Sequence, residues 1–328
     1  MNLGRGVSAA ASLVGRQLPD EALKLARRLG GGASLEHAVR GRTVMITGAS
    51  SGIGRAAALR VGAAGATVLL VARSVDKLEQ TRAEIERRGG VGHVAPCDLS
   101  DIPAVERMAA DTLERHGRVD LLVNNAGRSI RRSVALSYDR FHDFERTMAL
   151  NYFGPLRLIL ALLPQMRERG RGHIVNVSTI GVQASPPRFS AYIASKAALD
   201  AFSRCAAPEL VDDGVTITTV YMPLVRTPMI EPTSAYRSLP ALSPEQAAEM
   251  IAEALVHRPK QIGTALGNLG QLAYAANPRS VDAVLATAYR LFPDSAAARG
   301  PSGEERGTRD QVGAVGRAFG NLLRGIHW

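Results

Sequence analysis

The segment Y-I-A-S-K places two side chains suited to proton transfer four residues apart. At this spacing Tyr192 and Lys196 share one face of a helix. An ammonium beside a phenol favours the phenolate and lowers the pKa of the phenol from about 10 toward neutral pH. The pair therefore predicts a tyrosine general acid for a carbonyl group that receives a hydride. Lys196 is one of only four lysines in this arginine-rich chain, and the broad, permanently charged guanidinium of arginine suits the role poorly.

A serine stands where such a carbonyl oxygen would need a hydrogen bond. Ser178 follows the apolar run G-H-I-V-N-V, which is typical of a buried strand, and so falls at the carboxyl end of that strand. Open α/β sheets bind their ligands outside the carboxyl ends of the strands. Ser178 is therefore a candidate for holding the carbonyl oxygen.

A glycine-rich turn precedes these residues in the chain. The run T-G-A-S-S-G-I-G, residues 47–54, follows an apolar strand and opens a helix. Glycines in this context let the backbone approach a pyrophosphate, which then lies on the helix N-terminus. The pattern predicts a dinucleotide-binding turn.

Strand and helix patterns alternate from residue 42 onward. Strand patterns cover 42–47, 66–72, 91–98, 119–124, 172–178 and 215–221, and helical patterns include 76–88, 102–116, roughly 138–169 and 190–212. Continuous apolar strands alternating with helices predict an α/β fold with a doubly wound parallel sheet and right-handed crossovers. Residues 223–243 are rich in proline and read as irregular. A helix then begins with Ser243 as N-cap and Pro244 at its first position. Residues 262–292 read as one short strand and two apolar helices, broken at Asn277-Pro278.

The composition excludes several classes of protein. The 328 residues are 46% hydrophobic and 21% charged, with a formal net charge of +10, which is typical of a soluble globular protein. Aromatic residues are few and the arginines are spread along the chain, so nucleic-acid binding is not expected, whereas anionic small molecules or an anionic membrane surface suit the charge. Cys97 and Cys205 form neither a disulfide framework nor a metal-binding spacing, so we expect no metal and a reducing compartment. Both cysteines are expected to be inert core residues.

The combination T-G-x-x-x-G-x-G, then N-N-A-G, Ser178 and Y-I-A-S-K, resembles the short-chain dehydrogenase/reductase family over about residues 40–260. The resemblance implies a Rossmann fold and a catalytic tetrad of Asn151, Ser178, Tyr192 and Lys196. It places Asp98 at the adenine and Thr227 at the nicotinamide amide. The implied cofactor residues are Thr47, Gly48, Ser50, Ser51, Gly52, Ile53, Gly54, Asp98, Asn125, Ala126, Gly127, Tyr192, Lys196 and Thr227. Asn124, with Ala126 and Gly127, would support the cofactor and the central sheet.

The end of the second strand bears on which cofactor is used. NAD enzymes place an acidic residue there to bind the ribose 2′-hydroxyl. This chain has Arg73 and Ser74 at that point and no acid before Asp76, and both residues suit a 2′-phosphate. NADP(H) is therefore the expected cofactor.

The chain is similar over nearly its whole length to bacterial fatty acyl-CoA reductases of the Acr type. The similarity rests on M-P-L-V-R-T-P-M, where Pro223-Leu224 replaces the usual Pro-Gly, on N-N-A-G-R-S-I-R-R-S and on L-F-P-D-S-A-A-A. It implies NADPH-dependent reduction of a long-chain acyl-CoA to fatty aldehyde and free coenzyme A. The phosphates of coenzyme A would then meet a group of arginines that follows the fourth strand or lies near it: Arg128, Arg131, Arg132, Arg188 and Arg226. The alternative is that these arginines are solvated or pair with Asp139, Asp143 or Glu145.

Four regions are expected along the chain. They are a basic N-terminal extension (1–40), the Rossmann catalytic domain (41–260), a C-terminal helical extension that shapes the substrate pocket (261–294) and a mobile tail (295–328). The extension 1–40 lacks the apolar core of a signal peptide but could form a short basic amphipathic helix, lying on a membrane or on the protein itself. The sequence contains no run of about 18 apolar residues, so no membrane span is expected.

Other functions remain open at this point. The same tetrad would serve an NADP(H)-dependent ketone or secondary-alcohol oxidoreductase acting on a lipid-like substrate. A non-catalytic NADP(H)-binding scaffold is a more distant alternative. The expected setting is the cytoplasm, with peripheral contact at the inner face of the membrane as a hypothesis, and the resemblance implies a homo-oligomer.

Overall fold

The computed structural model describes residues 34–230, 239–291, 294 and 298. The chain divides into two units, residues 1–34 and 35–328, and all the described elements belong to the second. The amphipathic helix expected near the N-terminus and nearly all of the expected tail lie outside the described residues. The second unit begins inside the segment assigned to the N-terminal extension, because the short helix α3 (Leu35–Val39) packs into the core.

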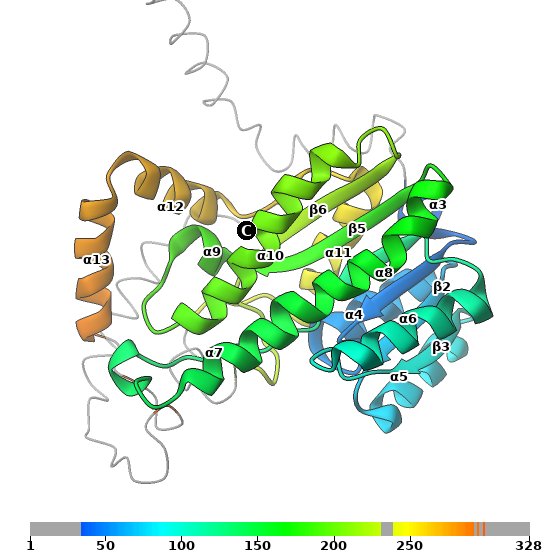
Figure 1. The fold of residues 1–328 in the computed structure, drawn as a ribbon, viewed down its shortest axis with the longest axis horizontal. Helices are drawn as coiled ribbons and strands as arrows, with labels where there is room; N and C mark the ends of the chain where they lie inside the picture. Colours follow the sequence, from blue (N-terminus) through cyan, green and yellow to red (C-terminus); the bar gives the residue numbers. More distant parts are fainter. Residues whose placement is uncertain (1–33, 231–238, 292–293, 295–297, 299–328) are drawn as a thin grey trace, which may run out of the picture. The chain divides into compact units, whose positions relative to one another are not determined.

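A seven-stranded parallel sheet with the order β3-β2-β1-β4-β5-β6-β7 forms the centre of this unit (Figure 1). The strands are β1 (Thr43–Thr47), β2 (Thr67–Ala72), β3 (Val91–Pro96), β4 (Leu121–Asn124), β5 (Gly172–Thr179), β6 (Val215–Met222) and β7 (Gln261–Ile262). The strand order reverses between β1 and β4, which is where this class of sheet opens its ligand crevice. The predicted doubly wound parallel sheet is confirmed.

Helices cover both faces of the sheet. Those packed on the strands are α4 (Gly52–Ala63), α5 (Val75–Arg87), α6 (Ile102–His116), α8 (Gly154–Glu168), α9 (Ile180–Ala184), α10 (Ser190–Glu209) and α11 (Pro244–His257). The helices α7 (Phe141–Met148), α12 (Ala265–Ala276) and α13 (Pro278–Leu291) pack mainly on other helices. A single turn of 3-10 helix, η1 (Val134–Leu136), lies between β4 and α7. The helices α12 and α13, predicted with a break at Asn277-Pro278, are confirmed, whereas α3, α9 and η1 were not predicted.

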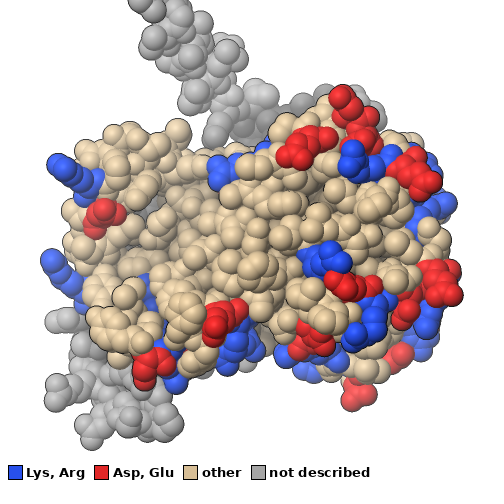
Figure 2. All heavy atoms as spheres, viewed as in Figure 1, with Lys and Arg blue, Asp and Glu red and all other residues tan. Residues whose placement is uncertain are grey.

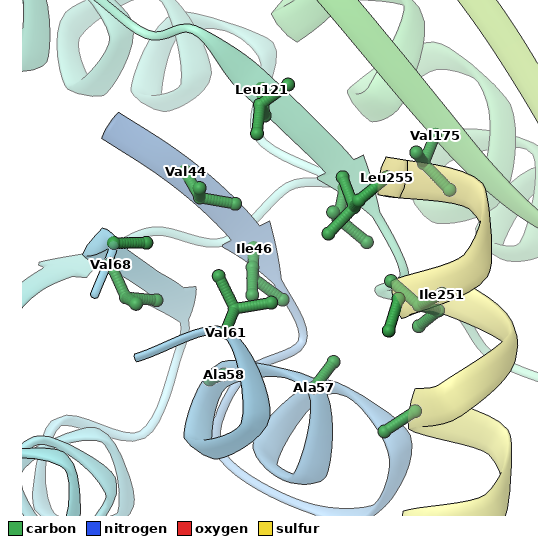
Figure 3. Packing of buried hydrophobic residues seen from close by; sticks show 14 of the residues in the cluster. Val44, Ile46, Ala57, Ala58, Val61, Val68, Leu121, Val175, Ile251 and Leu255 are labelled. Atoms are coloured by element: carbon green, nitrogen blue, oxygen red, sulfur yellow. The ribbon is translucent and has the colours of Figure 1, made fainter. Parts of the chain in front are cut away.

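Alternate strand residues face two separate cores. Val44 and Ile46 of β1 lie in the cluster with Val61 of α4 and Leu255 of α11, as Figure 3 shows. Met45, between them, points to the opposite face, where α6, α8 and α10 cover the sheet. This two-sided burial explains why the strands read as continuous apolar runs rather than as alternating patterns.

A π-helical segment, η2 (Ala149–Phe153), joins α7 to α8. The pattern over 138–169 predicted one helix, and the chain is helical without a gap from Phe141 to Glu168, but its ladder widens by one residue around Asn151. Such π-turns occur frequently at functional sites. Gly154 follows at once, and a Cβ there would lie 2.1 Å from the carbonyl oxygen of Leu99, so only glycine fits.

The helix Phe141–Glu168 is long and apolar enough to cross a membrane by length and composition, contrary to the expectation of no such segment. Its most apolar window has a mean hydropathy of 1.2, and 39% of that window is buried. Leu158, Ile159, Leu162 and Met166 are fully buried in the core beneath the sheet. Core helices of soluble proteins meet the same criterion, so the finding is weak evidence for a membrane span.

The N-terminus of α11 follows the sequence prediction. The hydroxyl of Ser243 accepts a hydrogen bond from the backbone N–H of Gln246 (3.2 Å), and the side chain of Gln246 accepts one from the N–H of Ser243 (2.8 Å). Pro244 occupies the first helical position. The reciprocal pair satisfies two of the N–H groups that a helix start leaves without intrahelical partners.

Candidate active site

The carboxyl ends of β1 and β4 are joined through one threonine. The hydroxyl of Thr47 accepts hydrogen bonds from the backbone N–H groups of Asn125 (2.9 Å) and Ala126 (3.0 Å). The side chain of Asn125 donates to the carbonyl of Thr47 at 3.0 Å. Thr47 therefore holds the two loops at the switch point together, a structural role beside the expected cofactor role.

The glycines of the first turn are required by its geometry. Gly48 has a φ of +71°, and a Cβ there would lie 2.9 Å from the amide nitrogen of Asn125. A Cβ on Gly54 would lie 2.3 Å from the carbonyl oxygen of Gly48. Gly52, with a φ of +51°, would bring its Cβ to 3.1 Å from the methyl group of Thr227. The structure thus brings Thr227 beside the turn although the two are distant in sequence.

The N-terminus of α4 suits an anion. Ser51 is its N-cap residue, and its side chain makes no capping hydrogen bond. The N–H groups of the first helical residues, Gly52, Ile53 and Gly54, have no intrahelical acceptors because no earlier turn exists, and the helix dipole adds partial positive charge. These residues therefore fit the pyrophosphate of a dinucleotide.

Asn151 links three segments through a fully buried amide. Its oxygen accepts the backbone N–H of Arg128 (2.8 Å), and its nitrogen donates to the carbonyl of Arg128 (2.9 Å) and to the hydroxyl of Ser195 (2.9 Å). Ser195 in turn donates to the carbonyl of Tyr192 at 2.7 Å. The π-turn therefore positions both the loop after β4 and the start of α10.

Lys196 lies in the same buried cluster. Its ammonium donates to the carbonyl of Val177 at 2.8 Å, and a Cβ on Gly127 would lie 3.2 Å from both the Lys196 nitrogen and the Asn151 oxygen. Lys196 is only 4% exposed. Burial lowers the pKa of Lys196 to about 8. The tetrad residues Asn151 and Lys196 are thus brought together around Gly127.

The hydroxyl of Ser178 is buried and has no hydrogen-bond partner among the described residues. Ser178 is 6% exposed and lies near the end of β5, followed directly by Thr179 and the short helix α9. A buried hydroxyl without a partner costs about 1–3 kcal/mol, so its persistence suits a group that meets an oxygen of a bound molecule. Tyr192 is half-buried on α10, one turn before Lys196.

A chain of amides runs under the site, and of its members only Asn124 was expected to support the sheet. Asn124 donates to Asn176 on β5 at 2.9 Å, and Asn176 donates to the hydroxyl of Ser203 on α10 at 2.8 Å. Asn124 is therefore buried in the sheet and fastens β4 to β5, while Asn176 fastens β5 to α10. The asparagine inside the apolar run G-H-I-V-N-V-S was the available signal, since a polar residue within a buried strand needs a partner.

Arg73 follows β2, the strand next to the edge strand β3. Its guanidinium is 70% exposed and stands 3.9 Å from the carboxylate of Asp98, which also accepts from the N–H (2.9 Å) and hydroxyl (2.6 Å) of Ser100. Burial opposes ionisation of Asp98, but the bonds from Ser100 and the charges of Arg73 and Arg128 outweigh it and lower the pKa of that carboxyl. Positive charge therefore accumulates beside the end of β3.

The arginines expected to meet coenzyme A differ in their surroundings. The guanidinium of Arg132 is 13% exposed, pairs with Asp143 at 3.1 Å and donates to the carbonyl of Ala298. The alternative weighed from the sequence, pairing with Asp143, is therefore the one found for Arg132. Arg188 is also buried, with Asp294 at 3.1 Å, whereas Arg226 is exposed.

The two cysteines differ from each other. Cys97 is buried, and burial followed by the charges of Asp98 and Asp101 raises the pKa of its thiol to about 11, as expected for an inert core residue. Cys205, expected in the core as well, is exposed. Its helix α10 packs with the opposite side against the sheet, which the apolar pattern around Cys205 did not reveal.

The burial of Lys196 should make the stability of the cofactor-free protein depend on pH. The unfolded chain holds the lysine proton up to a pKa near 10.5, whereas the folded protein releases it near 8. The unfolded state therefore binds more protons in this interval, and the free energy of unfolding should rise from about pH 8 to pH 10.5 by on the order of 3 kcal/mol. Urea denaturation of wild type and Lys196→Met at each pH would measure this rise, which the variant should lack.

The comparison between the two proteins is needed because of Cys97. Its raised pKa has the opposite sign, so its ionisation removes stability from about pH 9 upward. Both proteins contain Cys97, and the difference between them isolates the lysine. Equal slopes in wild type and Lys196→Met would contradict the assigned burial of the ammonium.

Comparisons with known proteins agree with this geometry. The model of the short chain dehydrogenase family matches residues 42–237. The chain is 51% identical over 290 residues to a fatty acyl-CoA reductase of Acinetobacter baylyi, covering 88% of this chain and 96% of the relative. It is 48% identical over 246 residues to a fatty acyl-CoA reductase of Mycobacterium tuberculosis, covering 75% and 84%.

Solved structures show the same architecture. A short-chain dehydrogenase from Streptomyces avermitilis superposes with a TM-score of 0.64 at 34% identity, covering 76% of this chain and 98% of that one. A metagenomic short-chain oxidoreductase in complex with NADP gives a TM-score of 0.59 at 33% identity, covering 67% and 92%. With the glycine turn, the buried lysine and the family match in agreement, this chain belongs to the short-chain dehydrogenase family.

Proposed function

We propose that this protein reduces the thioester carbonyl of a long-chain fatty acyl-CoA to fatty aldehyde and free coenzyme A, using NADPH. The observation that carries the proposal is the buried, unpartnered hydroxyl of Ser178 in a chain 51% identical to a fatty acyl-CoA reductase over 88% of its length. A carbonyl oxygen is the kind of acceptor that this hydroxyl lacks.

A bound nicotinamide cofactor would supply the hydride. Ser178 would donate a hydrogen bond to the thioester oxygen and so stabilise the negative charge that develops there. Tyr192 would give its phenolic proton to that oxygen, yielding a thiohemiacetal. When the carbon–sulfur bond then breaks, the sulfur leaves with a proton as free thiol and the carbon becomes the aldehyde. The reaction uses no cysteine nucleophile, in keeping with the buried thiol of Cys97.

Lys196 has the position to assist this proton transfer. It lies one turn after Tyr192 on α10, and its nitrogen is fixed by the carbonyl of Val177, next to Ser178. A fixed positive charge there favours the phenolate that remains after proton donation. Asn151 holds the frame through Arg128 and Ser195.

The choice of NADP(H) rests on Arg73 and Ser74. Arg73 follows the carboxyl end of β2, where a ribose 2′-phosphate would lie. Its guanidinium is exposed and stands 3.9 Å from the carboxylate of Asp98. Ser74 begins α5 as N-cap without a side-chain capping bond. Both groups are therefore suited to a phosphate.

We propose that the acyl chain lies along α12. This helix packs on α9, where the buried Gln183 donates to Asn268 at 2.9 Å, and α9 directly follows the strand that ends beside Ser178. The helix α12 has no charged residue, and Figure 2 shows little charge on the surface over it. Large apolar side chains are exposed on α12 and α13: Leu269, Leu272, Tyr274, Val284 and Tyr289.

Arg188 fastens the far end of this extension to the loop before α10. Its guanidinium lies over the ring of Tyr289 at 4.0 Å, donates to the carbonyl of Tyr289 at 3.1 Å and pairs with Asp294 at 3.1 Å. Asp294 also accepts the backbone N–H of Ser133 at 3.1 Å. We propose that this latch, formed by Arg188, Tyr289 and Asp294, sets the position of α13 relative to the acyl chain.

The remaining arginines and the cellular setting complete the proposal. Arg128, Arg131 and Arg226 are the proposed partners of the coenzyme A phosphates, without Arg132, whose guanidinium is taken up by Asp143. We propose a cytoplasmic homo-oligomer with peripheral membrane contact, because a long-chain acyl-CoA partitions into membranes and the exposed apolar side chains of α12 and α13 suit such contact.

The primary test is the Tyr192→Phe variant. With palmitoyl-CoA, wild type should oxidise NADPH and release free thiol in equal amounts, followed by NADPH absorbance and a thiol reagent. Loss of the phenolic proton should reduce both rates by about 10²- to 10⁴-fold. Tyr138→Phe, which alters a tyrosine 84% exposed on the surface, serves as the control and should keep both rates. NADPH oxidation with ketones and no thiol from any acyl-CoA would instead favour the ketone reductase alternative.

The cofactor proposal predicts a change in selectivity for Arg73→Ala. Removing one charged hydrogen bond to a phosphate costs about 1.5–3 kcal/mol, so the preference for NADPH over NADH in kcat/KM should fall by about 10- to 100-fold, through the KM for NADPH. Arg87→Ala removes an exposed arginine of α5 that pairs with Glu84 and should leave the preference unchanged. An unchanged preference in Arg73→Ala would contradict the role given to Arg73.

The latch predicts an effect that depends on acyl chain length. Asp294→Asn leaves the buried Arg188 without its carboxylate, which loosens the attachment of α13. The KM for palmitoyl-CoA should rise several-fold, while the KM for butyryl-CoA and for NADPH changes little. Asp282→Asn, a change of the same kind on the exposed side of α13, is the matched control. Equal changes for both acyl-CoAs would count against a role of the latch in holding the acyl chain.

A further inference from the structure

A cavity of about 240 Å³ lies at the amino end of the sheet, opposite the proposed active site. It is bordered by the residues that precede or begin β1, β4 and β5 and by the residue that ends α11. They are Arg40, Gly41, Arg42, Arg118, Asp120, Arg171, Gly172 and Arg258. The tetrad and the glycine turn lie at the carboxyl ends of the same strands, so the cavity belongs to a different site.

The cavity wall holds five arginines and one carboxylate, and that carboxylate is already fully engaged. Asp120 accepts from the N–H of Thr43 (2.9 Å), from Arg169 (2.7 Å) and from Arg118 (3.2 Å). Arg40 has Glu36 at 3.5 Å, with both side chains exposed. Asp120 therefore has little capacity left for the other arginines.

Three of the five arginines have no acidic partner among the described residues. In the part of the chain that the structure describes, no carboxylate lies within ion-pair distance of Arg42, Arg171 or Arg258. Arg42 and Arg258 are half-buried, and burial together with the charge of Arg42 lowers the pKa of Arg258. Like charges facing each other in a partly buried space destabilise the folded protein unless an anion lies between them.

Helix ends explain part of this arrangement, but not the cavity. The C-termini of α6, α8 and α11 fall at the amino edge of the sheet, and their partial negative charge favours cations there. A cation can interact with these helix ends while it remains exposed to water, so this interaction does not require a cavity. Arg258 instead ends α11 in the left-handed region, with a φ of +48°, and lines the same cavity as Arg42.

We propose that this cavity binds a small anion with phosphate chemistry and at least two negative charges. Arginine forks match phosphate oxygens in pairs, and several forks converge here. The volume falls below the roughly 300–1,000 Å³ typical of drug-sized ligands. The fit is therefore to one or two phosphoryl groups rather than to a whole nucleotide.

Binding at this site should stabilise the folded protein. The cavity joins the starts of three central strands to the end of α11, and the unfolded chain does not assemble these arginines. An anion that binds only the folded state raises the melting temperature in proportion to the logarithm of its concentration. Stabilisation is thus the direct signature of the proposed site.

The test is thermal unfolding with inorganic pyrophosphate as the probe. All samples contain saturating NADP⁺, which occupies the cofactor site, and sodium chloride keeps the ionic strength equal. We expect a rise in Tm on the order of 5 °C at saturating pyrophosphate. Arg42→Gln and Arg258→Asn should lose this rise, with asparagine chosen because it tolerates the left-handed backbone. Arg87→Gln removes the same charge from α5, away from the cavity, and should keep it.

The variants also make an opposite prediction without the anion. Because each removes one of two facing charges, Arg42→Gln and Arg258→Asn should melt no lower than wild type in chloride alone. A pyrophosphate-dependent rise that persists in both variants, or no rise in wild type, would overturn the proposal. Cosedimentation with phosphatidylglycerol vesicles that is lost in both variants would identify a lipid headgroup as the source of the phosphate, and unchanged cosedimentation would identify a free anion.

Discussion

The buried amide of Asn151 is the interaction on which the geometry of the site depends. It uses its oxygen and both hydrogens on partners from two other segments, Arg128 and Ser195. In a regular α-helix this side chain would project in a different direction. The extra residue in the π-turn η2 turns it toward the end of β4. Removing the amide would leave a backbone N–H and C=O unpaired in the interior, which costs more than the net value of the bonds themselves.

The buried cluster around Asn151 also contains two groups that lower the stability of the folded protein, Lys196 and Ser178. A lysine in the interior is unfavourable, and the carbonyl of Val177 is the one hydrogen-bond acceptor that the structure gives its ammonium among the described residues. The unpartnered hydroxyl of Ser178 adds a second unfavourable group within the same few residues. Neither group would be retained by packing alone, and both become favourable when an anionic or carbonyl oxygen is bound. The surrounding sheet, covered on both faces, supplies the stability that tolerates them.

The sequence was sufficient for the parts of the fold that depend on local pattern. Strand and helix positions, the parallel sheet, the capping of α11 by Ser243 and the break at Asn277 all follow from period, capping and turn chemistry. It was not sufficient where long-range contacts decide. Arg132 reads like Arg128 in the motif, yet only the fold brings Asp143 against one of them. Likewise the contact of Gln183 with Asn268 spans 85 positions and leaves no periodic signal.

Helices that cover a parallel sheet place their N-termini at the carboxyl ends of the strands and their C-termini at the amino ends, so the two ends carry opposite partial charges. This protein has backbone N–H groups or basic side chains at both ends. At the carboxyl edge the N-terminus of α4 presents backbone N–H groups, so an anion can be held with few basic side chains. At the amino edge the ends of α6, α8 and α11 present carbonyl groups, which repel anions. Any anion site there must therefore be made of side chains, and it needs more of them. Arg42, Arg171 and Arg258 border one cavity and meet that requirement, whereas the glycine turn at the opposite ends of the strands, residues 47–54, contains no arginine.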